Sequence, residues 1–135
     1  MTSAVQAPGI NQRRGIRVAP DARANVTVHI NGPDFIEIQK AVDIGEGGVR
    51  LRVPHRFEGC HIDNLVTLVI SLPLSDTPPF RLEGRIRHAG NDTFGVQFAS
   101  VGENARQLLR RYIALRLRES EGLLAYLKFR LGLVR

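Results

Sequence analysis

Short runs that alternate between apolar and polar residues dominate this sequence up to residue 100. In ANVTVHI (24–30) the apolar side chains fall on one face of an extended chain and the polar ones on the other. A period of two residues is that of a half-buried β-strand. Five more such runs follow, separated by turn residues: 35–44, 49–53, 65–72, 81–88 and 93–99. They predict a mainly β fold, a small six-stranded antiparallel β-barrel.

The alternation also predicts which side chains face the core. Ile36 and Ile38 share one face of the second run, and the denser run 65–72 reads as a strand buried on both faces. In the other runs we expect these residues to point inward: Val26, Val28, Ile30, Val49, Leu51, Val53, Leu82, Ile86, Phe94, Val96 and Phe98.

From Glu103 the period becomes helical, and Gly122 is a candidate interruption. The first apolar stripe consists of Leu108, Leu109, Tyr112, Ile113 and Leu117, with arginines outside it at 106, 110, 111, 116 and 118. A second stripe consists of Leu123, Leu124, Leu127 and Leu131. We therefore expect three parts: a flexible arm (1–11), the barrel with the start of the helix (12–115), and a C-terminal helical extension (116–135).

Composition sets limits on the class of protein. A chain of 135 residues amounts to one domain, and its single cysteine excludes an internal disulfide. No segment resembles a signal peptide, and the longest apolar run is too short to cross a bilayer, so we expect a cytoplasmic protein. The net charge is +6, and residues 103–135 hold eight Lys/Arg against three Glu. Such a surplus favours anionic partners.

Enzyme signatures are absent from the sequence. The four histidines are scattered, and only His61 adjoins the cysteine, Cys60, which is not the pattern of a zinc site. The glycine-rich stretch DIGEGG (43–48) lacks the lysine and the spacing of a phosphate-binding loop. We therefore expect no catalytic residues, no metal and no cofactor.

Two short motifs carry chemistry. The first, QRRGIRV, holds Arg13, Arg14 and Arg17, whose guanidinium groups suit phosphates and the O6/N7 edge of guanine. The second, DIGEGG, places Asp43 at the mouth of a turn whose glycines let a ligand approach the backbone. A carboxylate can accept two hydrogen bonds from the N1–H and N2–H₂ edge of guanine. Taken alone, each motif is explained as well by a solvated basic arm or a strand-connecting turn.

Together, and in this order, the motifs resemble those of the PilZ domain family, bacterial receptors for the second messenger cyclic di-GMP. The family pattern is RxxxR in an N-terminal loop and, some thirty residues on, DxSxxG at a turn of a six-stranded barrel. Here RRGIR (13–17) and DIGEGG supply them, and FGVQF (94–98) before a helix is also typical. The resemblance covers roughly residues 12 to 115.

The resemblance implies roles for individual residues. Arg13 and Arg17 would grip the phosphates and guanine Hoogsteen edges of cyclic di-GMP, and Arg14 would add charge or stacking. Asp43 would read the guanine Watson–Crick edge, and Gly48 would leave room for the ligand.

One residue of the second motif departs from the family pattern, because Gly45 stands where the family has serine. Loss of one hydrogen bond to a charged or buried partner costs roughly 1.5–3 kcal/mol, which would weaken binding about 10- to 150-fold. We expect Gly45 to line the ligand site and to weaken binding without abolishing it.

The function we expect is therefore a cyclic di-GMP receptor or adaptor whose arm folds over the ligand and signals to a partner. The alternative is a degenerate PilZ domain that no longer binds nucleotide and acts as a protein–protein adaptor. A nucleic-acid-binding barrel is disfavoured, because the phenylalanines lie in phase with the core and tryptophan is absent. The leucine stripe of the tail would pack on the barrel or mediate contact with a protein or a second copy, with a membrane surface a weaker choice.

Overall fold

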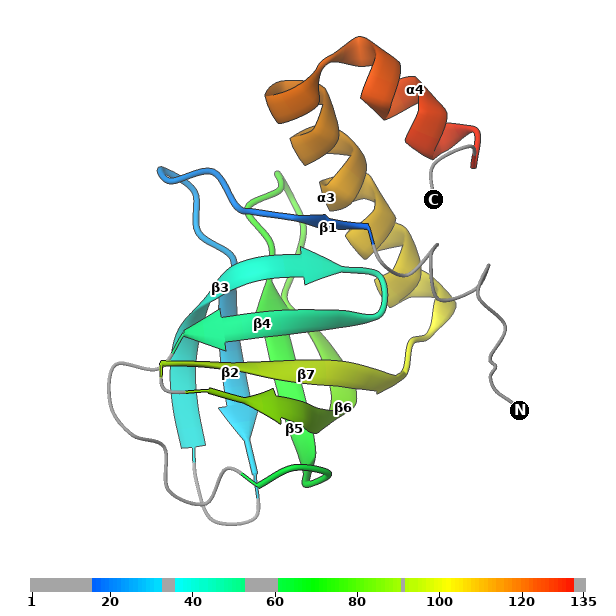
Figure 1. The fold of residues 1–135 in the computed structure, drawn as a ribbon. Coiled ribbons are helices and arrows are strands. Elements are labelled where there is room, and N and C mark those ends of the chain that lie inside the picture. The colour runs from blue at the N-terminus through cyan, green and yellow to red at the C-terminus, as the bar shows by residue number, and fades with distance from the viewer. Residues whose placement is uncertain (1–15, 33–35, 53–60, 91, 133–135) are drawn as a thin grey trace, which may run out of the picture.

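A closed antiparallel barrel forms the body of the computed structural model, which describes residues 16–32, 36–52, 61–90 and 92–132 (Figure 1). Its strands are β1 (Arg17–Val18), β2 (Thr27–Asn31), β3 (Ile36–Gly45), β4 (Gly48–Arg52), β5 (Leu65–Ser71), β6 (Phe80–Ala89) and β7 (Thr93–Ser100). They pair in the order β3-β2-β5-β6-β7-β4, and β4 pairs back with β3 to close the barrel. The two-residue β1 pairs with the end of β3. The predicted six-stranded barrel is confirmed.

The barrel interior is filled by the inward side chains that the alternation predicts. All of them that the structure describes are buried, and Val53 lies outside the described residues. The most deeply buried include Val26, Val28, Ile30, Val49, Leu51 and Ile86, each with no exposed surface. Burial of an apolar side chain of this size contributes roughly 1.5–3 kcal/mol, so these alternating residues hold the barrel together.

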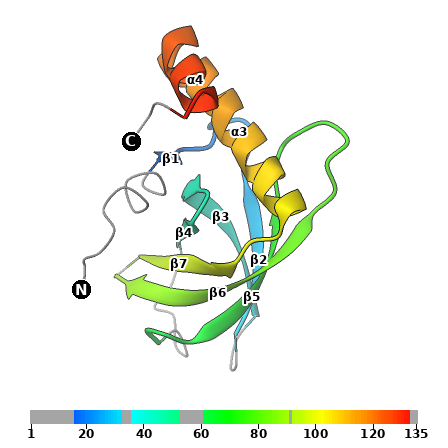
Figure 2. The same cartoon turned by 90° about the vertical axis from the view of Figure 1, so that its right-hand side faces the viewer.

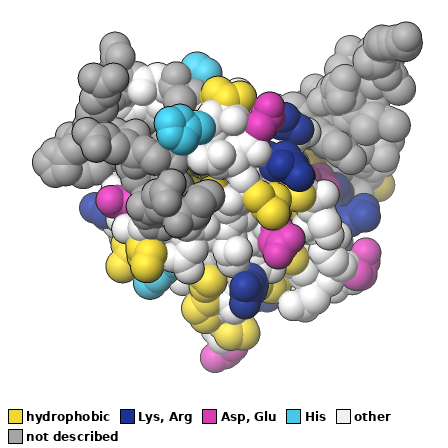
Figure 3. All heavy atoms as spheres, turned by 90° about the horizontal axis from the view of Figure 1, so that it is seen from below, with side chains coloured by type: hydrophobic (Ala, Val, Ile, Leu, Met, Phe, Trp, Pro, Cys, Tyr) yellow, Lys and Arg dark blue, Asp and Glu magenta, His cyan; other side chains and the backbone are white. Residues whose placement is uncertain are grey.

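One detail of the strand predictions is wrong, and in another strand the inward face changes along its length. In β5 only Val66, Leu68 and Ile70 are buried, whereas Leu65 is 47% exposed, because only one face of a barrel strand points inward. In β3 a bulge between residues 41 and 43 shifts the register against β4. The bulge reverses which face is inward, so that Ile44 is buried while Ile36 is 77% exposed. Apolar side chains consequently reach the outer surface at several places (Figure 3).

The chain ends in two helices, α3 (Glu103–Glu121) and α4 (Leu123–Arg130). The predicted stripe of α3 is confirmed, since Leu109, Tyr112, Ile113 and Leu117 are buried, and the helix lies across one end of the barrel (Figure 2). The predicted interruption is also confirmed, because Gly122 has φ +94°, which ends the helix. Helix α3 runs unbroken across residues 115 and 116, between which the boundary of the barrel domain and the extension was expected. In the part of the chain that the structure describes, no helix has the length and apolar character needed to cross a membrane.

Helix α4 folds back beside α3 and buries an aromatic residue rather than the predicted leucine stripe (Figure 1). Phe129 is 3% exposed, whereas Leu124, Leu127 and Leu131 are 66%, 43% and 70% exposed. Of the alternatives left open for this stripe, packing on the barrel is therefore excluded for the three leucines whose side chains are described.

Candidate anion-binding site

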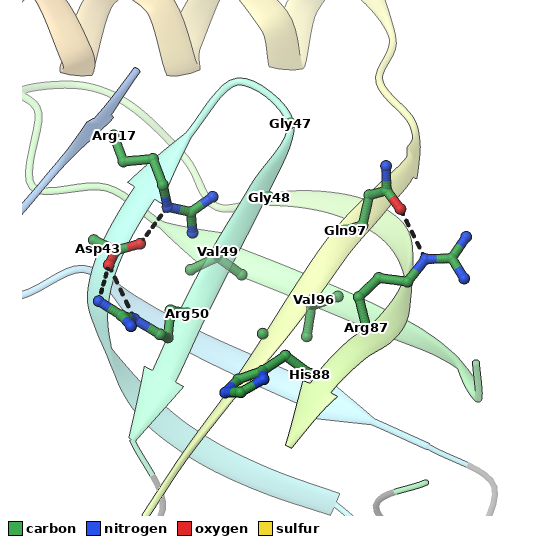
Figure 4. Close-up of a pocket in the computed structure, with 11 residues that line it drawn as sticks. Arg17, Asp43, Gly47, Gly48, Val49, Arg50, Arg87, His88, Val96 and Gln97 are labelled. Atoms are coloured by element: carbon green, nitrogen blue, oxygen red, sulfur yellow. Dashed lines mark hydrogen bonds and ion pairs between the residues drawn. The ribbon is translucent and has the colours of Figure 1, made fainter. Parts of the chain in front are cut away.

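Asp43 of β3 is held between two arginines (Figure 4). Its Oδ1 accepts a hydrogen bond from Nε of Arg17 at 2.5 Å. Its Oδ2 accepts two from Arg50, from Nη2 at 2.7 Å and from Nε at 3.0 Å. The Asp43 side chain is 15% exposed, and those of Arg17 and Arg50 are 36% and 48% exposed. A carboxylate that is largely covered and paired on both oxygens is fixed in orientation.

Three neighbouring strands bring these groups together. Arg17 belongs to β1 and pairs across the ladder with Gly45, two residues beyond Asp43. Arg50 belongs to β4 and is the ladder partner of Asp43 itself. The bulge in β3 lies immediately before Asp43, and bulges re-aim the side chains that follow them. The structure therefore joins the second arginine of the RxxxR motif to the aspartate of the second motif. Arg13 and Arg14 lie outside the described residues.

The structure explains why glycine occupies position 45, which the sequence alone did not reveal. A Cβ at this position would lie 2.5 Å from the backbone carbonyl oxygen of Ile16. That separation is far below van der Waals contact, and the obstacle is backbone rather than a flexible side chain. Glycine at 45 thus permits β1 to pair closely with β3 and places Arg17 beside Asp43.

The other glycines of the turn also serve close strand packing. A Cβ on Gly48 would lie 2.5 Å from the carbonyl oxygen of Val96 on β7. Gly47 accepts a hydrogen bond through its carbonyl oxygen from the amide of Phe98 at 2.8 Å. Among the described glycines only Gly122 and Gly132 have positive φ, so the glycines of this turn do not adopt the left-handed conformation.

A hollow of about 470 Å³ opens beside Asp43. Its lining residues are Arg17, Asp43, Gly47, Gly48, Val49, Arg50, Arg87, His88, Gly95, Val96 and Gln97. The volume lies within the range of roughly 300–1,000 Å³ that small-molecule sites occupy. Three arginines and bare glycine backbone around a single carboxylate suit an anionic ligand that also carries hydrogen-bond donors.

Four polar residues of this hollow were missed by motif reasoning: Arg50, Arg87, His88 and Gln97. Arg87 donates from Nε to Oε1 of Gln97 at 2.8 Å (Figure 4). Arg87 also pairs with Asp63. Alternation places Arg50 and Arg87 on the outer face of their strands, which is the signal that the sequence did contain. Only the strand order β6-β7-β4-β3 shows that this outer face borders Asp43.

The motif turn is also tied to the C-terminal helices. Arg110 of α3 donates from Nη1 to Oε2 of Glu46 at 2.6 Å. The same guanidinium lies over the ring of Phe129, 4.4 Å from its centroid, and donates from Nη2 to the Phe129 carbonyl oxygen at 3.4 Å. One arginine therefore contacts both the turn that follows Asp43 and helix α4.

Comparison with known families identifies this architecture. The model of the PilZ domain matches residues 11–115. The chain belongs to the PilZ domain family. No protein with a curated description matches the sequence.

Solved structures similar to this PilZ domain include three at low sequence identity. The inhibitor of motility MotI of Bacillus subtilis aligns with a TM-score of 0.64 at 17% identity over 77% of this chain and 51% of its own. The PilZ domain of Escherichia coli YcgR with c-di-GMP aligns with a TM-score of 0.62 at 12% identity over 78% and 91%. The K. pneumonia MrkH–c-di-GMP complex aligns with a TM-score of 0.60 at 12% identity over 78% and 52%. The chain thus spans about half the length of MotI and of MrkH.

Proposed function

We propose that this PilZ domain is a receptor for cyclic di-GMP, which it binds in the hollow beside Asp43. The observation that carries the proposal is the Asp43 carboxylate fixed between Arg17 and Arg50 at the open hollow. Family membership and the two similar structures that contain c-di-GMP support the choice of ligand. The domain is a binding and adaptor module, as PilZ domains are known to be, rather than an enzyme.

Recognition would begin with an exchange of partners at Asp43. Each carboxylate oxygen can accept more than one hydrogen bond, so a guanine N1–H and N2–H₂ edge can add to Asp43 or displace an arginine from it. A displaced Arg17 guanidinium would then be free to pair with a phosphate, to which it binds through two parallel N–H donors. Arg13 and Arg14 would complete the grip on the ligand, with Gly45 and Gly48 beside it.

The change of contacts at Arg17 would also be the signal. Arg17 lies in β1, which holds only two residues in the ladder, so moving it breaks few backbone hydrogen bonds. The chain between β1 and β2 is further held by Arg116 of α3, whose Nε donates to the carbonyl oxygen of Ala19 at 2.9 Å. Movement of β1 would therefore reach α3 and a protein that contacts the helices.

We assign the arm to residues 1–11, the receptor domain to 12–115 and the extension to 116–135 of a cytoplasmic protein.

Isothermal titration calorimetry with cyclic di-GMP tests this proposal. We expect the intact chain to bind, and Arg17→Ala and Asp43→Ala each to weaken binding at least about 10-fold, the effect of losing one charge-assisted hydrogen bond. Arg52→Ala is the matched control, since Arg52 is an exposed arginine at the far end of β4. GMP should not compete at equal concentration. Binding that neither substitution weakens would place the ligand elsewhere.

A second candidate function is that of an adaptor that no longer binds nucleotide. Two observations favour it: Gly45 supplies no hydroxyl, and both oxygens of Asp43 are already paired within the chain. Absence of any heat or competition with cyclic di-GMP, in a protein whose unfolding remains cooperative, would select this candidate.

A further inference from the structure

A second and larger groove lies on the helical side of the domain, between α3, α4 and the segment after β5. Its volume is about 740 Å³. The lining residues are Pro73, Leu74, Ser75, Gln107, Arg110, Arg111, Ala114, Leu115, Arg118, Tyr126, Phe129 and Arg130. Along α3 the lining extends from Gln107 to Arg118, which is about 16 Å at the rise of an α-helix. This length fits about five residues of an extended chain.

The charged residues that line this groove are all positive, four arginines with no acidic residue among them. Arg110 is paired with Glu46, so Arg111, Arg118 and Arg130 carry the surplus charge. Among the described residues, neither Arg111 nor Arg118 has a hydrogen bond or ion pair, and Arg130 has only a hydrogen bond of 3.4 Å to the Tyr126 hydroxyl. Both Arg118 and Arg130 lie over the ring of Tyr126. The guanidinium of Arg118 is 5.6 Å and that of Arg130 is 5.8 Å from the ring centroid. An aromatic ring orients a guanidinium but does not neutralise its charge.

We propose that this groove binds an extended acidic segment of a partner protein. Arg111 and Arg118 are seven residues apart and lie on one face of α3, about 10 Å apart along its axis. In an extended chain alternate side chains share one face, and those two and four positions apart are separated by about 7 and 13 Å, on either side of this spacing. The segment would therefore carry acidic residues at alternate positions on the face turned towards α3, with apolar residues between them on its other face, towards Leu74.

The observations favour a protein segment over the other polyanions. The two aromatic residues of the groove are already engaged, since Phe129 is 3% exposed and Tyr126 is contacted by two arginines, so neither offers a free face on which bases could stack. A membrane surface is flat, whereas these arginines line a recess with apolar walls. Guanidinium groups beside apolar surface match carboxylates interspersed with apolar side chains.

Fluorescence anisotropy on the full chain tests the groove without any nucleotide, so its outcome is independent of the proposed receptor function. The probe is a labelled peptide about ten residues long in which aspartate and leucine alternate. We expect saturable binding that weakens with salt, and Arg111→Glu should weaken it at least about 10-fold. The Arg118→Glu variant should do the same. A peptide with asparagine in place of aspartate should not bind.

Arg52→Glu is the matched control, because it changes the net charge equally at an exposed arginine on the barrel. Binding by Arg52→Glu should stay within about 2-fold of the unchanged chain. Equal losses in all three variants would show attraction to overall charge and would overturn the proposal. So would absence of binding up to about 1 mM probe. Tighter binding of an oligothymidine or of anionic vesicles with the same dependence on Arg111 would assign the groove to nucleic acid or membrane instead.

Discussion

Gly45 is the residue at which the structure makes its sharpest prediction. The Gly45→Ala variant adds a Cβ that would lie 2.5 Å from the carbonyl oxygen of Ile16. Because neighbouring backbone must shift to admit it, the overpacking should cost about 1–3 kcal/mol of the free energy of unfolding. Replacing glycine by alanine also removes freedom from the unfolded chain, which returns about 0.4–1 kcal/mol.

A second glycine separates these two effects. Gly95 lies in β7, and a Cβ there would meet only Cβ of His88 at 3.6 Å, an ordinary contact. Gly95→Ala should therefore show the gain from the unfolded chain without the clash. The difference in the free energy of unfolding between the two variants, measured by urea denaturation, should be about 1–3 kcal/mol, with Gly45→Ala the less stable. Equal stability would refute the view that glycine is needed at position 45 to let β1 pack closely against β3.

The Gly45→Ser variant extends the comparison to ligand binding. Serine and alanine add the same Cβ, so the ratio of their dissociation constants for cyclic di-GMP reports the hydroxyl alone. We expect Gly45→Ser to bind about 10- to 150-fold more tightly than Gly45→Ala, the range for one hydrogen bond to a charged partner. Equal affinities would show that the hydroxyl contributes nothing in this site.

Three further predictions concern other parts of the molecule. A double-mutant cycle of Asp43→Ala and Arg50→Ala should give a coupling free energy of about 1 kcal/mol, since Arg50 donates twice to Oδ2 of Asp43 but is itself about half-exposed; additivity would contradict the geometry. The hydroxyl of Tyr112 is buried without a hydrogen-bond partner among the described residues, so Tyr112→Phe should raise the free energy of unfolding by about 1 kcal/mol in urea denaturation. Burial raises the pKa of Tyr112 from 10.0 to about 12, so the folded state keeps a proton that the unfolded chain loses in that window. The stability from this group is complete below pH 10 and falls by up to about 3 kcal/mol as the pH rises to 12, a loss that Tyr112→Phe should lack when both proteins are compared across that range. Phe129→Ala should reduce the helical circular dichroism signal by the share of the eight-residue α4 while leaving the unfolding midpoint of the barrel nearly unchanged; a large fall in the midpoint would show that α4 belongs to the core.

The alternating runs were enough to predict the barrel, because each buried face repeats locally every two residues. In β2 the sequence alone places Val28 and Ile30 inside. The phase of β3 could not be predicted, since the bulge before Asp43 is defined by register against β4, which is a long-range property. The two-residue β1 has no periodicity to detect.

Part of the candidate site could be predicted from the sequence and part could not. The motifs identified Arg17 and Asp43, and the structure joins these two side chains. Gly45 and Gly48 were expected to lie against the ligand, and the structure shows that they let neighbouring strands pack closely. Arg50 and Arg87 were predicted only to be exposed, because their proximity to Asp43 depends on strand order. Likewise Arg110 was expected on the outer face of α3, yet it is half-buried against Glu46, sixty-four residues earlier in the chain.

The contact between Glu46 and Arg110 limits how strongly the two ends of the domain can influence each other. Anything that binds beside Asp43 and disturbs the turn changes the free energy of α4 docking, and by reciprocity anything that binds α4 changes affinity at Asp43 by the same factor. Arg110 is 34% exposed, so this ion pair contributes about 1 kcal/mol at most. That amount corresponds to a factor of about 5 in either affinity, so through this contact the domain would act as a graded modulator rather than an all-or-none switch.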